Sequence, residues 1–235
     1  MTPAATPAVV VLTERKASAD AGRPLAATVA EALAAGATAI LLREKDLPPV
    51  DRRRLAESLR TLTADAGAAL LVAGDATLAR AVGADGVHLA ATDPWPDPPA
   101  PPRAQAGPSA GGDTAPPWSG NGASLPVGRS CHTVAELVAA AAAGARWATF
   151  SPVFATASKP GYGPALGLNG LAAGCRAVPG LAVLALGGLG PGRAVGCVRA
   201  GAAGVAVMGA VMRAGDPAAV VRSLVDELAP LRSRP

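Results

Sequence analysis

Short apolar runs alternate with Ala-rich stretches along most of the chain, and this alternation is the strongest signal in the sequence. The runs are apolar at successive positions rather than at every second one, which predicts strands buried on both faces, as in a parallel sheet. The stretches between them have the length and composition of helices. The expected strands are residues 9–12, 37–42, 69–72, 86–89, 125–128, 147–150, 181–186 and 204–208.

Helical stretches separate most of these runs and follow the last one. Repeated strand-then-helix units predict a single α/β domain in which eight strands close into a (β/α)8 TIM barrel. The alternative is an open doubly wound sheet, but the first strand is followed by Thr13, Glu14 and Arg15 and not by a GxGxxG turn. The expected helices are residues 25–35, 48–66, 76–82, 133–143, 168–177, 192–200 and 217–228.

One segment, residues 94–124, interrupts the alternation after the fourth strand. It consists mainly of Pro, Gly, Ala and Ser, has no periodicity, and contains Trp95 and Trp118. Such a composition cannot bury enough surface to fold alone, so we expect a disordered insertion within the barrel domain of residues 1–235. The other interpretation is a lid over the barrel mouth, since long loops in compact domains are often functional.

Composition narrows the classes of ligand and of cellular location. Hydrophobic residues make up 50% of the 235 positions but aromatic residues only 3%, so the core must be built mainly from Ala, Val and Leu. A net charge of +4 without a Lys/Arg-rich run favours a small anionic ligand over nucleic acid. The densest basic segment, residues 52–54, is expected on a solvated helix face.

The cysteines and the apolar segments indicate a cytoplasmic protein. Cys131, Cys175 and Cys197 are odd in number and widely spaced, which favours free thiols over a disulfide framework or a zinc site. No stretch is long and apolar enough to suggest a membrane span, and the N-terminus does not resemble a signal peptide. A homo-oligomer is compatible with the sequence, although no interface can be identified from it.

Two of the three lysines stand directly after apolar runs, where barrel enzymes place their active sites. Lys45 follows the second expected strand and Lys159 lies in the Gly-rich loop after the sixth. Because the other basic residues are arginines, two compact ammonium groups at these positions point to contacts with phosphate or carboxylate. The alternative is that both are solvated loop lysines.

Glycines at the ends of the last two strands suggest a phosphate site. Gly187 and Gly188 follow the seventh strand, and Met208 and Gly209 follow the eighth. Glycine lets backbone N–H groups approach a phosphate closely, and this region binds phosphate in many barrels. Plain turn geometry is the alternative explanation.

His132 is the better of the two histidines for proton transfer, because it follows the fifth strand and imidazole titrates near neutral pH. It could equally be a residue at the start of a helix for which Thr133 is the N-cap. His88 lies inside an apolar run, where we expect a structural histidine bonded to the backbone.

Together, these motifs resemble the thiamine phosphate synthase and TenI-like superfamily. The resemblance implies a phosphate-binding (β/α)8 barrel of thiamine biosynthesis whose ligand is a small phosphorylated heterocycle. Its ordered motifs are Arg43-Glu44-Lys45, the segments 84–89, 128–132, 153–159 and 186–189, and the final strand 204–208.

Two activities occur in this superfamily, and the resemblance separates them by a few residues. The synthase joins a pyrimidine pyrophosphate to a thiazole phosphate with Mg²⁺, and typically has Asn-Asp after the third strand and Gln in the second. Ala73-Gly74 and Leu41 stand at those positions here. Asp93 would be the remaining metal ligand of a synthase, and whether Asp75 replaces the acid missing at Gly74 is open.

The tautomerase branch uses no metal or other cofactor, and it aromatises a thiazole carboxylate phosphate by moving a proton. Members carry Arg-Glu, a third-strand Gly and a Gly-Arg-Ser-x-His motif, matching Arg43-Glu44, Gly74 and residues 128–132. We therefore expect a thiazole tautomerase, with the synthase and a non-catalytic thiazole or thiamine phosphate-binding protein as alternatives. The resemblance implies His132 as acid/base, substrate contacts from Arg43, Lys45, Thr156 and Lys159, and phosphate contacts from Gly187, Gly188, Met208 and Gly209.

Overall fold

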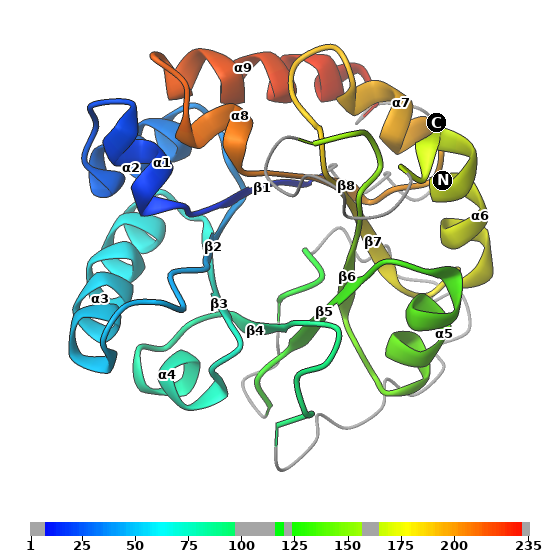
Figure 1. The fold of residues 1–235 in the computed structure, drawn as a ribbon, viewed down its shortest axis with the longest axis horizontal. Coiled ribbons are helices and arrows are strands. Elements are labelled where there is room, and N and C mark those ends of the chain that lie inside the picture. Colours follow the sequence, from blue (N-terminus) through cyan, green and yellow to red (C-terminus); the bar gives the residue numbers. More distant parts are fainter. Residues whose placement is uncertain (1–7, 97–115, 120–123, 157–164, 232–235) are drawn as a thin grey trace.

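The computed structural model describes residues 8–96, 116–119, 124–156 and 165–231. Its strands are all parallel and form a closed barrel in chain order, with helices on the outside (Figure 1). The predicted (β/α)8 barrel is therefore confirmed, and the open sheet is wrong. The strands are β1 (Ala8–Leu12), β2 (Ala39–Leu42), β3 (Ala69–Ala73), β4 (Gly86–Leu89), β5 (Val127–Cys131), β6 (Trp147–Phe150), β7 (Ala182–Leu186) and β8 (Gly204–Val207).

Each expected helix is present, with ends within two residues of the expected ones. Two further helices, α1 and α8, were not predicted from the sequence. The helices are α1 (Arg15–Asp20), α2 (Leu25–Ala34), α3 (Pro49–Asp65), α4 (Ala76–Ala81), α5 (Val134–Ala142), α6 (Gly167–Ala177), α7 (Ala194–Arg199), α8 (Gly209–Met212) and α9 (Pro217–Leu228), followed by a 3-10 turn, η1 (Ala229–Leu231).

The fifth strand lies later in the chain than the apolar pattern predicted. It spans Val127–Cys131 instead of residues 125–128, because Arg129, Ser130 and Cys131 continue the pairing with β6. Pairing with β6 gives these residues backbone partners whatever their side chains are. His132 consequently follows the strand directly, at the end of the barrel where the other parallel strands also end.

Side chains on the two faces of the strands form two separate apolar clusters. The outer cluster joins strand residues such as Ile40 and Leu42 to helix residues such as Leu59 and Leu137. The inner cluster fills the barrel mainly with Ala, Val and Leu, as the composition suggested, together with Trp118 and Trp147. The large indole rings are needed because the small side chains around them would leave the interior unfilled.

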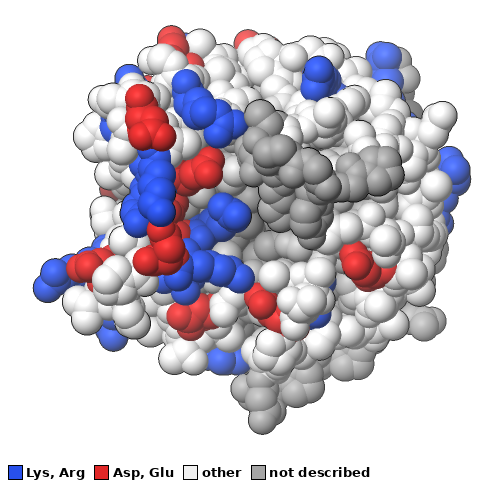
Figure 2. Space-filling view, in the orientation of Figure 1, with Lys and Arg blue, Asp and Glu red and all other residues white. Residues whose placement is uncertain are grey.

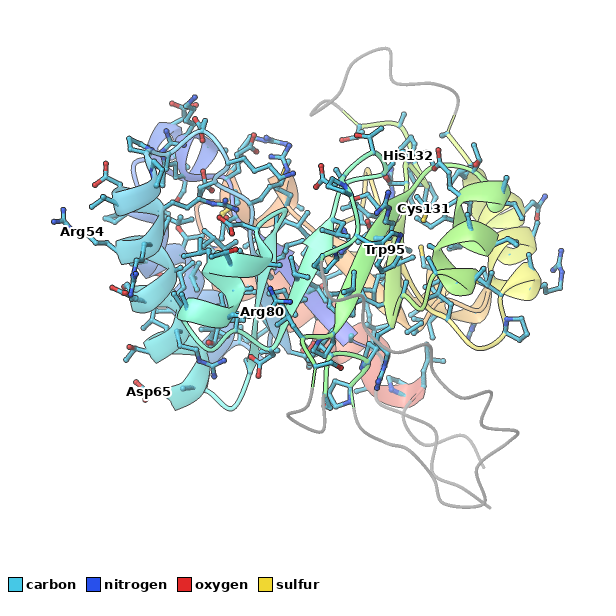
Figure 3. The ribbon with its side chains drawn as sticks, turned by 90° about the horizontal axis from the view of Figure 1, so that it is seen from below. Arg54, Asp65, Arg80, Trp95, Cys131 and His132 are labelled. Carbon is cyan, nitrogen blue, oxygen red and sulfur yellow. The ribbon has the colours of Figure 1, made fainter. Side chains whose placement is uncertain are left out.

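Trp118 shows where part of the insertion lies. It is 4% exposed and meets Trp147, the first residue of β6, edge to face at 6.1 Å between ring centroids. Arg146, which precedes β6, donates a hydrogen bond from Nη2 to the carbonyl of Ser119 at 3.3 Å. Residues 116–119 therefore lie at the amino ends of the strands, opposite the mouth that carries His132 (Figure 3). The predicted disorder or lid role of residues 97–115 and 120–123 concerns segments outside the described residues.

Within the described part of the chain, no helix is both long and apolar enough to cross a membrane.

Candidate active site

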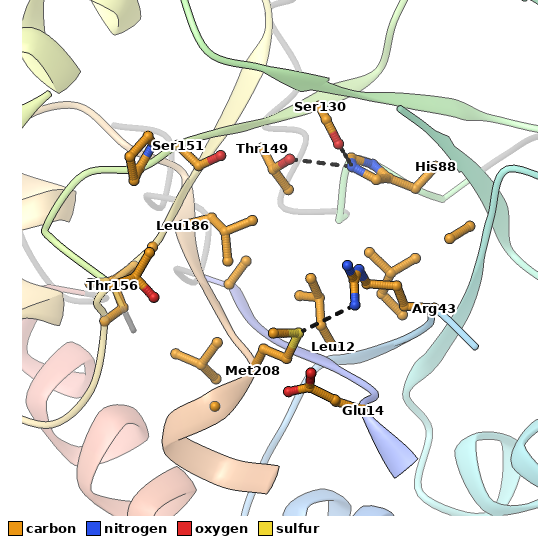
Figure 4. A pocket seen from close by; sticks show the side chains of 18 of the residues that line it. Leu12, Glu14, Arg43, His88, Ser130, Thr149, Ser151, Thr156, Leu186 and Met208 are labelled. Atoms are coloured by element: carbon orange, nitrogen blue, oxygen red, sulfur yellow. Dashed lines mark hydrogen bonds between the residues drawn. The ribbon is translucent and has the colours of Figure 1, made fainter. Parts of the chain in front are cut away.

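A cavity of about 850 Å³ opens at the carboxyl ends of the strands. It brings together the expected site residues that the structure describes, and a close view shows Arg43, Thr156 and Met208 among the side chains around it (Figure 4). Lys159 lies outside the described residues, so its role stays a prediction. The expected residues on the cavity wall are Arg43, Lys45, His132, Thr156, Gly187, Gly188, Met208 and Gly209.

His132 is held with one ring nitrogen turned to the backbone. Its Nδ1 lies 2.9 Å from the carbonyl oxygen of Ser151 and 3.3 Å from that residue's hydroxyl. A carbonyl oxygen can only accept, so Nδ1 carries the proton and the neutral ring has its lone pair on Nε2. This tautomer makes His132 chemically able to act as a base through Nε2.

The start of helix α5 fixes the backbone around His132. Thr133 is the N-cap, as predicted, and its hydroxyl accepts from the backbone N–H of Glu136 while the Glu136 carboxylate returns the bond, forming a capping box. The same carboxylate accepts from the backbone N–H of His132. His132 therefore adjoins a helix cap, as one interpretation expected, and it also lines the cavity, while its part in proton transfer stays a prediction.

His88 bonds to side chains and not to the backbone, which corrects the expectation for this residue. Its Nδ1 lies 3.1 Å from the indole Nε1 of Trp147, and its Nε2 lies 3.1 Å from the Ser130 hydroxyl and 3.3 Å from the Thr149 hydroxyl. Burial, assisted by the nearby Lys45 charge, lowers the pKa of His88 to about 4. His88, Ser130 and Thr149 all line the cavity, and the sequence did not reveal the last two as site residues.

Lys45 occupies the space beside Gly74. Its Nζ is 3.3 Å from Oδ2 of Asp93, and a Cβ added at Gly74 would lie 2.7 Å from the same Nζ. Asp93 Oδ2 also accepts from the backbone N–H of Ala90 at 2.8 Å. Burial acts to raise the pKa of Asp93, but the Ala90 bond and the Lys45 charge outweigh it, so the pKa is lowered overall.

Asp75 does not replace the acid missing at position 74. Its Oδ1 accepts from the backbone N–H of Leu78 at 2.8 Å, which caps helix α4, and its Oδ2 lies 3.4 Å from Arg52. Arg52 is 9% exposed and donates to the carbonyl of Ala73, so the expectation of a solvated face is wrong for this arginine. A guanidinium with these partners holds the end of β3 against helix α3.

The donor set around Asp93 does not fit the Mg²⁺ that the resemblance associates with synthases. Mg²⁺ prefers octahedral oxygen ligation and usually at least one or two carboxylates beside the substrate's phosphates. Here Asp93 is paired with an ammonium group, which would repel a second cation. Among the described residues, no group of three or more His, Cys, Asp or Glu side chains could hold a metal.

Charged residues gather on one side of the mouth, over the loops that follow β1 and β2 (Figure 2). Glu44 is 5% exposed and accepts from both the backbone and the side chain of Arg15, so it holds the two loops together. Arg43 lies with Nη1 3.9 Å from the sulfur of Met208. Arg213, which the sequence did not single out, also lines the cavity and lies 3.5 Å from Glu14.

The strand-end glycines are required by chain packing, whatever they bind. Gly187 and Gly188 have φ of 98° and 62°, in the left-handed region that favours glycine. A Cβ at Gly187 would lie 2.8 Å from Pro152, and one at Gly188 would collide with the carbonyl of Ala155. The loop after β6 therefore packs directly against the end of β7, and the phosphate contacts remain a prediction.

Cys131 adjoins His132 in sequence but is not suited to nucleophilic chemistry. The side chain is fully buried, and this burial raises the pKa of its thiol to about 12. A thiol with such a pKa carries almost no thiolate at neutral pH.

Comparisons with known proteins identify the family of the chain. The family model described as thiamine monophosphate synthase matches residues 9–106 and 120–211. A thiamine-phosphate synthase from Roseiflexus sp. (strain RS-1) is 38% identical over 216 residues, which are 92% of this chain and 83% of that protein. One from Moorella thermoacetica is 39% identical over 203 residues, covering 86% of this chain and 88% of the relative.

A solved structure gives the same result at the level of the fold. Thiamine phosphate pyrophosphorylase from Pyrococcus furiosus superposes with a TM-score of 0.75 at 27% identity, covering 95% of this chain and 96% of that one. The barrel, the ordered strand-end residues and the extent of the match lead to one conclusion. The chain belongs to the thiamine monophosphate synthase family.

Proposed function

We propose that this protein is a metal-independent thiazole tautomerase that acts on a thiazole carboxylate phosphate. The observation that carries the proposal is the position of Lys45, whose ammonium lies where a side chain at position 74 would project. Its ion pair with Asp93 holds this ammonium at the cavity wall. An ammonium can hold an anionic substrate group without further ligands.

The reaction is an isomerisation in which one proton leaves a ring carbon and one proton is returned elsewhere on the same molecule. The Nε2 lone pair of His132 takes the proton, and the resulting imidazolium returns it, so the enzyme ends unchanged. Arg43 and Lys45 hold the anionic groups of the substrate from the opposite side of the cavity. Such an exchange needs no redox partner and no leaving group.

A second candidate is thiamine phosphate synthase itself, and the names of the relatives favour it over the tautomerase. Relatives named for this activity are 38% and 39% identical over most of the chain. That reaction would require Asp93 to be released from Lys45 and the substrate's own phosphates to supply the other metal ligands. The replacement of the acid by Gly74 argues against it.

Two assays on one preparation separate these candidates. Aromatisation of the thiazole carboxylate phosphate is followed by ultraviolet absorbance for wild type, His132→Ala and Arg222→Gln, the last being a control on helix α9. We expect the His132 variant to lose at least a hundredfold in rate and the control to keep its rate. Equal rates for wild type and His132→Ala would refute the role of the histidine.

The second assay supplies the pyrimidine pyrophosphate and thiazole phosphate with and without Mg²⁺. Formation of thiamine phosphate that depends on Mg²⁺, with no aromatisation, would establish the synthase and reject the tautomerase. Tight binding of thiazole phosphate in a calorimeter without turnover in either assay would reject both enzymes and leave a binding protein.

A further inference from the structure

A column of aromatic rings runs through the barrel from its amino end to the floor of the cavity. Trp118 meets Trp147 edge to face, and the indole of Trp147 lies nearly parallel to the His88 ring, with 6.2 Å between ring centroids. Gly86 on β4 and Gly128 on β5 leave the room that this indole requires. A Cβ at Gly86 would lie 2.6 Å from the Trp147 ring, and one at Gly128 would collide with it.

The indole determines which nitrogen of His88 carries the proton. Trp147 Nε1–H is a donor only and lies 3.1 Å from His88 Nδ1. Nδ1 must therefore be the unprotonated nitrogen, and the proton of the neutral ring is on Nε2. If both nitrogens of His88 were protonated, its Nδ1–H would point at the Nε1–H of Trp147, and two buried donors would face each other.

The tautomer in turn determines what the two cavity hydroxyls can do. His88 Nε2–H donates toward the oxygens of Ser130 and Thr149, at 3.1 Å and 3.3 Å. Neither hydroxyl can donate its own proton to His88 Nε2, because this nitrogen is itself a donor. Within the described residues, His88 is the only side chain hydrogen-bonded to either hydroxyl, and both face the cavity (Figure 4).

We propose that His88 is a positioning residue, oriented by Trp147, that turns the hydroxyl protons of Ser130 and Thr149 into the cavity. The floor is then a pair of hydrogen-bond donors, which selects a ligand with an acceptor atom on its heterocycle. A ring that presents a donor there could bond only to the remaining lone pair of a hydroxyl, and the hydroxyl proton would then lack a partner on the ligand, which is costly in a buried site. The identity of this ligand rests on the proposed function, but the orientation of the hydroxyls does not.

The column also assigns a role to the part of the insertion that the structure describes. Trp118 supports Trp147 from below, so the insertion after β4 contributes to the cavity floor from the opposite end of the barrel. This contact is steric, and it does not require the insertion to reach the mouth.

The first test is spectroscopic and needs no ligand. Long-range ¹H–¹⁵N correlation spectra of the full chain at pH 7.5 report the tautomer of each of its two histidines, and His132→Gln assigns the signals. We expect His88 in the Nε2–H form in wild type and a mixture of tautomers in Trp147→Phe, which keeps a ring but removes the N–H. A wild-type His88 protonated on Nδ1, or no change in Trp147→Phe, would overturn the proposal.

The second test measures binding of thiazole phosphate by calorimetry in a double-mutant cycle. His88→Gln keeps an N–H donor that can reach the hydroxyls, whereas His88→Asn is too short. We expect His88→Asn and Ser130→Ala each to weaken binding about tenfold, the double variant to be little worse than either, and His88→Gln to recover most of the affinity.

Fully additive losses, or equal losses in the Gln and Asn variants, would show that His88 acts only as a structural core residue. Inorganic phosphate is the control ligand, and its affinity should be unchanged in His88→Asn. A wild-type protein that fails to bind thiazole phosphate would overturn the proposed function and the ligand preference together, while the tautomer spectrum would still decide the orientation of the hydroxyls.

Discussion

The buried His88 should make the protein lose stability in mild acid. The pKa of His88 is lowered from 6.5 to about 4, first by burial and then by Lys45 and Arg129, against an opposing effect of Asp93. The unfolded chain therefore binds more protons at this residue between those two pH values. Stability from His88 is complete above about pH 6.5 and is lost as the pH falls toward about 4.

The size of the loss follows from the two pKa values. At pH 4.5 the unfolded histidine is almost fully protonated and the folded one is mostly neutral, which corresponds to about 2.5 kcal/mol of unfolding free energy. We propose urea unfolding at pH 7.5 and 4.5, followed by tryptophan fluorescence, for wild type, His88→Gln and His132→Gln. Carboxylates also change the unfolding free energy in this pH range. The quantity to compare between the proteins is therefore the change in unfolding free energy from pH 7.5 to pH 4.5.

The two histidine variants form a matched pair, because the chain has only these two histidines. His88→Gln is expected to be less stable than wild type at pH 7.5, since a packed hydrogen-bonded ring is lost, but to fall about 2.5 kcal/mol less on acidification. His132→Gln serves as the second histidine variant measured in the same titration. If all three proteins lose the same free energy, the reasoning about the buried tautomer is refuted.

Three further predictions concern packing, phosphate and metal. Gly128→Ala should lower the unfolding free energy by about 1–3 kcal/mol because its Cβ would collide with Trp147, whereas Gly180→Ala, with open space around it, should be neutral in the same denaturant titration. Arg213→Gln should weaken binding of thiazole phosphate about tenfold and binding of the dephosphorylated alcohol less than twofold, because Arg213 lines the cavity. Equal losses of affinity for both ligands would contradict this prediction, and so would a similar loss in the control variant Arg222→Gln. A chelator should leave the aromatisation rate within twofold of its untreated value. A loss of rate that Mg²⁺ restores would contradict the proposal that the reaction is independent of metal.

Much of the barrel was predictable because the relevant physics is local along the chain. Runs such as residues 9–12 and 69–72 are apolar at every position, which a strand covered on both faces accommodates. Once the strands are parallel, their carboxyl ends share one mouth, so Arg43, Lys45 and His132 had to be neighbours of one cavity. The cap at Thr133 was predictable for the same reason, since it involves residues only three apart.

The details that bear on the chemistry depend on contacts across the barrel, which no local pattern encodes. β5 extends to Cys131 because β6 pairs with it, and Arg52 is buried because the carbonyl of Ala73 and the carboxylate of Asp75 lie beside it. The sequence showed that an acid is missing at Gly74. It did not show that the Lys45 ammonium lies beside this position.

His88 makes the same point most clearly. Its apolar neighbours in sequence correctly predicted burial, but its partners Ser130, Trp147 and Thr149 come from two other strands. The sequence by itself determined the strands, their order and the mouth at which the polar residues meet, because burial on both faces and helix caps act over a few residues. Closure of the barrel decided which side chains touch, because register and ring packing are set between strands that are distant in the chain.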